Sequence, residues 1–151
     1  MSSIIINIVL AFLVIVPVIY LTIRKKKATN TAFSEYLQKL KSQSIKVDKQ
    51  TSFSDACFAL SNEKKILYYL SYEGKEGQVH LDQVVGCTTL RQANSNIGNA
   101  VGAIGFQITE KGGANHSIPL LGNQTDKNVD ETQLLDVLEW EKIIKKYINK
   151  L

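Results

Sequence analysis

Two cysteines and two histidines are the residues of this 151-residue chain whose types could support nucleophilic or metal chemistry. A thiolate beside a histidine base is one arrangement of covalent catalysis, and the same four side chains are typical zinc ligands. Cys57, His80, Cys87 and His116 form neither a C-x-x-C nor an H-x-x-x-H pattern. We therefore expect no catalytic residues, no metal and no cofactor. A Cys/His-dependent enzyme remains a remote alternative.

The neighbours of these residues favour structural roles. His80 alternates with Val79 and Leu81, which predicts a histidine on the solvent face of a strand. Cys57 and Cys87 lie in apolar stretches, where a free cysteine behaves as a small hydrophobic residue. We expect both thiols to be buried and reduced.

Glycines at positions 98, 102 and 105 form the second candidate for chemistry. A phosphate-binding loop would continue into Lys followed by Ser or Thr, and would lie between a strand and a helix. The stretch from Gly98 through Gly102 to Gly105 has neither feature. It predicts a loop that leads into a strand, and this is a candidate binding loop because loops on a rigid scaffold often bind ligands.

The net charge of +4 comes from one short segment. Four of the 18 basic residues lie at positions 24–27, and the remaining 14 equal the 14 acidic residues in number. A basic segment of this kind is typical of contact with anionic lipid, through Arg24, Lys25, Lys26 and Lys27. The rest of the chain is formally neutral, so we expect no nucleic-acid partner.

The stretch from Ile4 to Ile23 contains no charged residue. Twenty residues at 1.5 Å each match the hydrocarbon thickness of a bilayer, so the pattern predicts a transmembrane anchor. Because basic residues stay on the cytoplasmic side, the run at 24–27 predicts a single-pass protein of the cell (inner) membrane. Its N-terminus would lie outside and its C-terminal domain in the cytoplasm.

Three segments follow from these patterns. Residues 1–27 are the predicted anchor with its basic flank, 28–50 a connecting helix and linker, and 51–151 a β domain with a C-terminal helix. The connecting helix has an apolar stripe that we expect to pack on the β domain, although it could instead lie on the membrane surface. Its members are Phe33, Tyr36, Leu37 and Leu40.

The β domain is predicted from alternating apolar residues and from turn signals. Strands are expected at 55–60, 65–72, 103–109 and 117–121, and at 78–81 and 84–91 as two strands or one bent strand. Gly86 marks a corner or bulge, and Pro119 suits an edge strand. A helix with an apolar stripe should begin at Asp130 or Thr132 and end near Asn149.

The stretches DACFALSNEKKILYYLSY, VHLDQVVGCTTLRQ and LLDVLEWEKIIKKYI resemble the opening hairpin, a later strand pair and the closing helix of pleckstrin-homology-like (PH-like) domains. The resemblance covers residues 51–149. The chain as a whole is similar in layout to bacterial proteins that tether such a domain to one membrane span. It implies an α+β fold. A small antiparallel β-barrel or sandwich would be closed by the C-terminal amphipathic helix.

The predicted function is a membrane-tethered binding or scaffold module that recruits or assembles a protein partner at the inner face of the membrane. Tethering raises the local concentration, so weak contacts suffice. The expected partners are the lipid bilayer and either another protein or further copies of this chain. The alternative is recognition of anionic lipid through the basic flank and the amphipathic helix.

Overall fold

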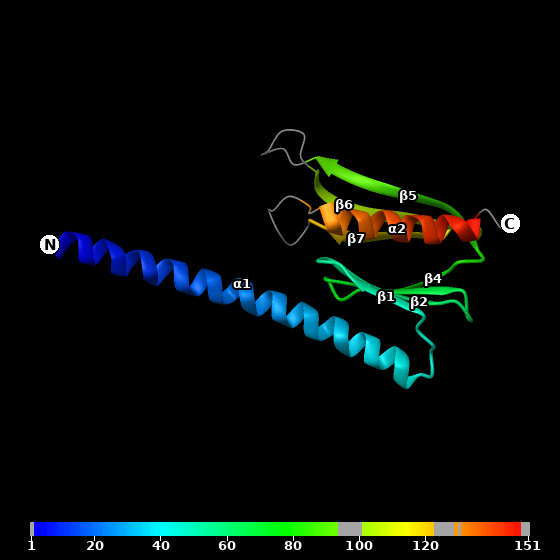
Figure 1. Ribbon diagram of the computed structural model, residues 1–151, viewed down its shortest axis with the longest axis horizontal. Helices are drawn as coiled ribbons and strands as arrows, with labels where there is room; N and C mark the ends of the chain where they lie inside the picture. The colour runs from blue at the N-terminus through cyan, green and yellow to red at the C-terminus, as the bar shows by residue number, and fades with distance from the viewer. Residues whose placement is uncertain (1, 94–100, 123–128, 130, 149–151) are drawn as a thin grey trace. The chain divides into compact units, whose positions relative to one another are not determined.

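The computed structural model describes residues 2–93, 101–122, 129 and 131–148 of the chain. These residues form nine elements (Figure 1), in the order α1 (Ser2–Ser42), β1 (Lys49–Ser52), β2 (Ala56–Ser61), β3 (Ile66–Ser71), β4 (Glu76–His80), β5 (Val84–Ala93), β6 (Val101–Glu110), β7 (Asn115–Leu121) and α2 (Glu131–Ile148). The chain divides into two compact units, Met1–Glu35 and Tyr36–Leu151. The expected boundaries after residues 27 and 50 stay predictions.

Helix α1 is one unbroken element, although the sequence had suggested an anchor followed by a separate connecting helix. Lys, Arg and Ala favour helix, so the basic run at 24–27 continues the helix instead of interrupting it. The helix ends before Ser44, which adopts a positive φ of 58°. Ahead of the basic run, the large apolar side chains that the structure describes, from Ile8 to Ile23, are all at least half exposed.

The predicted membrane span is contradicted. Over the described residues, no helix is both long enough and apolar enough to cross a membrane. This finding contradicts the predicted anchor from Ile4 to Ile23, and with it the single-pass localisation, the outside N-terminus and the cytoplasmic domain.

The first sheet is antiparallel, with the order β1-β2-β3-β4. The predicted hairpin is confirmed, because β2 pairs with β3 across a turn in which Lys65 has a positive φ of 54°. Strand β1 was not predicted: its first two residues lie in the expected linker, and its burial pattern alternates between half-buried and exposed. Tyr36 and Leu40 of α1 are buried in the second unit, as their stripe had indicated.

The second sheet has the order β5-β6-β7. Strands β4 and β5 belong to different sheets, so the two-strand reading of residues 78–91 is the correct one. A register shift between Val84 and Gly86 confirms the predicted bulge. Strand β7 is an edge strand, as Pro119 had suggested, and the ladder between β6 and β7 shifts register after Ile104.

The two sheets do not close into a barrel, so the predicted PH-like barrel is wrong. Each ladder ends at its outer strands within the described residues. Only isolated backbone hydrogen bonds connect the sheets, such as the bond from the Asp55 N–H to the Leu120 carbonyl (2.9 Å). Large side chains fill the space between the sheets. Sheets packed face to face usually lie about 10 Å apart, far beyond the spacing of hydrogen-bonded strands.

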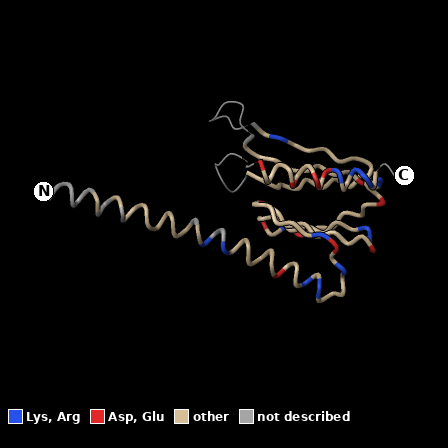
Figure 2. Tube along the Cα trace, viewed as in Figure 1, with Lys and Arg blue, Asp and Glu red and all other residues tan. Residues whose placement is uncertain are grey.

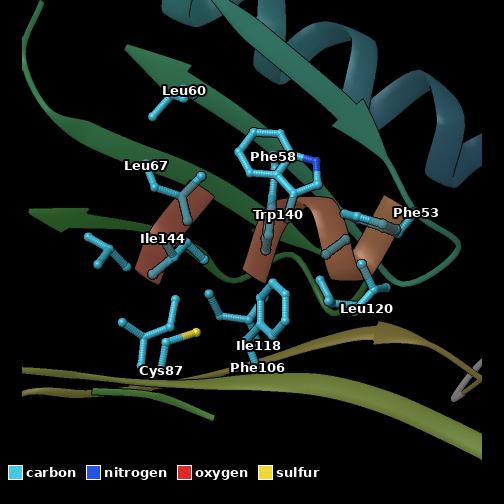
Figure 3. Close-up of a cluster of buried hydrophobic side chains, with 14 of the residues drawn as sticks. Phe53, Phe58, Leu60, Leu67, Cys87, Phe106, Ile118, Leu120, Trp140 and Ile144 are labelled. Atoms are coloured by element: carbon cyan, nitrogen blue, oxygen red, sulfur yellow. The ribbon is translucent and has the colours of Figure 1, made fainter. Parts of the chain in front are cut away.

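Phe58 is the centre of the packed interior, which both sheets and α2 line (Figure 3). Its ring lies 5.3 Å from Trp140 of α2 and 6.2 Å from Phe106 of β6, and it also contacts Phe53 edge to face at 5.5 Å. The apolar stripe of α2 buries Val137, Trp140 and Ile144. One interior thus fixes the position of β5 and α2 relative to the first sheet.

Candidate interaction surface

Four strands form the edges of the two sheets, namely β1, β4, β5 and β7. An edge strand presents unpaired N–H and C=O groups, which can pair with another chain unless charges, proline, bulges or short length prevent it. The four edges of this molecule differ in how far they are protected.

Strands β1 and β4 are short and are covered by charged side chains. Lys49 of β1 forms an ion pair with Glu139 of α2 and lies 5.5 Å from the centre of the Trp140 ring. At β4, Glu76 binds Lys39 at 2.8 Å, and the backbone N–H of His80 donates a hydrogen bond of 2.8 Å to a side-chain oxygen of Glu110. Partners from within the chain therefore occupy both edges.

Strand β7 is protected by its sequence and by its neighbour. Pro119 has no N–H to donate. The carbonyl of Leu120 already accepts the N–H of Asp55, and the carbonyl of Asp55 in turn accepts the N–H of Tyr72 at 2.7 Å. These contacts leave β7 little capacity to pair with an additional strand.

Strand β5 is the least protected edge among the described residues. It has ten residues, pairs only with β6 and contains no proline, and its ladder is regular from Gly86 to Gln92, with a register shift at either end. Its single charged residue is Arg91, and the strand is tan along most of its length in Figure 2. Val85 and Leu90 are 47% and 42% exposed, although large apolar residues are costly to leave in water. This combination is typical of a surface that receives another strand.

A cleft of about 380 Å³ adjoins the same strand, and we call it the outer cleft. Its floor lies on the face of the second sheet that points away from the interior, where Leu90 is opposite Gly105 and Gly105 is opposite Pro119. The wall comes from the first sheet and the turn after it, and includes Tyr69 and Tyr72. The outer cleft therefore continues from the β5 edge across three strands.

Gly105 makes the flat floor of the outer cleft possible. A Cβ atom at this position would lie 2.8 Å from the carbonyl oxygen of Ile118, closer than real Cβ contacts. Gly122, with a φ of +94°, lets the chain after β7 approach the backbone of Gly102 in the same way. Gly102 and Gly105 thus belong to β6 and not to a loop, and Gly105 serves the close pairing of β6 with β7. Gly98 lies outside the described residues.

A polar cluster closes the space between β3 and β7 beside the outer cleft. The Tyr69 hydroxyl lies 3.3 Å from Nδ1 of His116, and Nε2 of His116 lies 3.7 Å from Glu110. Burial, and after it the nearby Glu110, raises the pKa of Tyr69, so the phenol stays protonated at neutral pH. The sequence offered no signal for this cluster, because its members are far apart along the chain.

The two cysteines are buried and free, and burial is the main reason that the pKa of each thiol is raised to about 11. A thiol with this pKa is protonated at neutral pH and is a poor nucleophile or metal ligand. The described contacts of His116 are with Tyr69 and Glu110, not with a cysteine. His80 is exposed, as its alternation had suggested. Among the described residues, no three potential metal ligands lie together.

The residues predicted to contact lipid lie in the first unit, in α1. Ile23, Arg24 and Lys27 are exposed. The side chains of Ile4, Lys25 and Lys26 are outside the described part of the structure. Contact of the basic run with anionic lipid stays a prediction.

Comparison of the chain with models of protein families, with curated proteins and with solved structures finds no match. The likeness to PH-like domains therefore receives no support beyond the stretches that suggested it.

Proposed function

We propose that this chain is a protein-binding module whose partner adds an extended strand to the edge of β5. The observation that carries the proposal is the contrast among the four edges, since among the described residues only β5 is both long and almost uncharged, with a regular ladder from Gly86 to Gln92. Main-chain hydrogen bonds supply affinity in strand addition, and pockets for alternate side chains supply specificity.

The outer cleft offers the pocket for side chains that gives strand addition its specificity. Side chains on alternate residues of an added strand point to the same face. On the outer face, such side chains would lie beside Leu90 and could extend into the cleft toward Tyr72. The lining combines apolar, aromatic and hydroxyl groups with the ion pair of Glu73 and Lys75, which suits a partner segment that alternates apolar and small polar residues.

The test is site-specific crosslinking in intact cells of the source organism. A photoreactive residue at Thr88, on the exposed outer face of β5, should form crosslinks to a partner protein, whereas the same residue at Gln107 of β6 should not. Both positions are exposed on one face of one sheet, and only the first is on an edge. Equal crosslinking from both positions, or none from either, would refute strand addition.

A charge-bearing variant provides the second arm. Thr88→Lys combined with Leu90→Lys places two ammonium groups on the open edge, a device by which natural proteins block strand pairing. We expect this variant to lose the partner that the wild-type chain crosslinks, and Gln107→Lys to keep it. Retention of the partner by the edge variant would contradict the proposal.

A further inference from the structure

We infer that the strand added to β5 is β5 of a second copy of this chain, paired antiparallel about a twofold axis. This inference rests on the proposed function and names its partner. It starts from the strand's own sequence, VVGCTTLRQA, which is compatible with itself when one copy is reversed.

The symmetry places threonine at the axis. A twofold axis perpendicular to the sheet runs two copies of β5 antiparallel and keeps both interior faces on the same side. Because opposite residues must share a face, the axis has to pass through a residue. The middle of the ten-residue strand falls at Thr88 and Thr89. Threonine opposite threonine is a favourable cross-strand pair, whether the axis passes through the first or the second.

The only charge on the strand does not oppose this arrangement. With the axis at Thr88 or Thr89, the two Arg91 residues are six or four positions apart along the strands, which corresponds to roughly 14–20 Å. This separation exceeds the screening length of about 8 Å at physiological salt. With the axis at Thr88, Leu90 lies opposite Gly86, whose lack of a side chain leaves room for it.

The charge of residues 28–151 is also compatible with self-association. From residue 28 onward acidic and basic residues are equal in number, so two copies of this part have no net repulsion. With the axis at Thr89, Arg91 of one copy comes opposite Cys87 of the other. There it meets the ion pair of Glu141 with Lys145, which carries no net charge.

Disulfide trapping at the axis tests the inference on the full-length chain. Opposite residues of paired strands have Cβ atoms about 5 Å apart, near the range that a disulfide bridges. Under mild oxidation, either Thr88→Cys or Thr89→Cys should give a covalent dimer linked through the new cysteine, as identified by mass spectrometry of the linked peptide. The wild-type chain and Gln107→Cys should not, because Cys57 and Cys87 are buried and Gln107 lies on an inner strand.

Measurement of the dimerisation equilibrium tests whether the β5 edge, and not another surface of the chain, forms the dimer. Sedimentation over a concentration series should show a monomer–dimer equilibrium for the wild-type chain and Gln107→Lys. For Thr88→Lys with Leu90→Lys, the dimerisation constant should fall at least tenfold. A dimer that survives these two substitutions, or cysteine variants that crosslink no better than Gln107→Cys, would overturn the inference.

One outcome would support the proposed function and refute only the pairing with a second copy of the chain. The wild-type chain could stay monomeric while a photoreactive residue at Thr88 crosslinks to a different protein. Strand addition would then stand, and self-pairing would be refuted. Far-UV circular dichroism of each variant verifies that the lysine and cysteine substitutions leave the sheets folded.

Discussion

Strands β1 and β5 are both edge strands beside α2, yet they differ in how far their open edges are protected. Strand β1 has four residues, and its lysine is held by Glu139 and by the Trp140 ring. Strand β5 has ten residues and exposes apolar side chains. Charged contacts protect β1, and proline and a backbone hydrogen bond protect β7. The central run of β5 from Gly86 to Gln92 has no proline and only one charge, so the comparison singles out this run.

The largest expected effect comes from the interior that supports both edges. Trp140→Ala removes the side chain that packs on Phe58 and lies beneath Lys49. We expect the free energy of unfolding in urea to fall by about 3–5 kcal/mol, as for other large buried side chains. Leu135→Ala, at a 64% exposed position of the same helix, should change it by less than about 0.5 kcal/mol. Similar losses in both variants would mean that α2 does not join the two sheets.

A smaller effect is expected from the glycine that lets β6 and β7 approach. Gly105→Ala forces the new methyl group against the Ile118 carbonyl, and overpacking of this kind costs about 1–3 kcal/mol. Gly112→Ala is the matched control, because no atom lies within 4 Å of its added Cβ. Thermal and urea unfolding should distinguish the two. If Gly105→Ala is as stable as the control, the second sheet is looser than its register indicates.

Removing the charged contacts of β1 should lower the free energy of unfolding by about 1 kcal/mol. Lys49→Met keeps most of the side chain's length but removes its charge, and so both the ion pair with Glu139 and the cation–π contact. Lys142→Met, at an exposed position of α2, should be nearly neutral. A cycle with Glu139→Gln, measured by urea unfolding, isolates the ion pair. A coupling of zero would show that length alone, not charge, distinguishes β1 from β5.

The open edge should show the smallest change in stability. Thr88→Lys with Leu90→Lys alters two exposed side chains and should leave the free energy of unfolding of the monomer within about 0.5 kcal/mol of wild type. Measurements at dilution avoid the contribution of association, which stabilises the folded chain by mass action. A loss above 2 kcal/mol would mean that these residues support the fold and are not reserved for a partner.

Most strands were predictable because their patterns are local. The alternation of apolar residues located β2, β3, β6 and β7, and proline and glycine marked the edge and the bulge. Strand β1 was missed, since KQTS has no apolar residue and is fixed by its pairing with β2. The membrane span is contradicted because, over the described residues, no helix is long and apolar enough to cross a membrane. The closed barrel failed because the order of strands along the chain does not specify whether two sheets join.

The candidate surface was less predictable than the fold. Val85 and Leu90 have the same apolar character as buried strand residues, and only the sheet order shows that their strand is an edge. The glycines had been assigned to a loop because sequence cannot distinguish a glycine needed for a turn from one needed for close strand contact. Gly105 became interpretable only when Ile118 was placed beside it.

Phe58 has a consequence for how the polypeptide reaches its native state. It belongs to the second strand, but its partner Trp140 lies near the C-terminus, more than half of the chain away. Contacts between such distant segments make folding slow, because a long loop must close before they form. During synthesis, the seven strands would leave the ribosome before the last helix does. An incomplete chain that ends before residue 131 should therefore be sensitive to protease and dependent on chaperones.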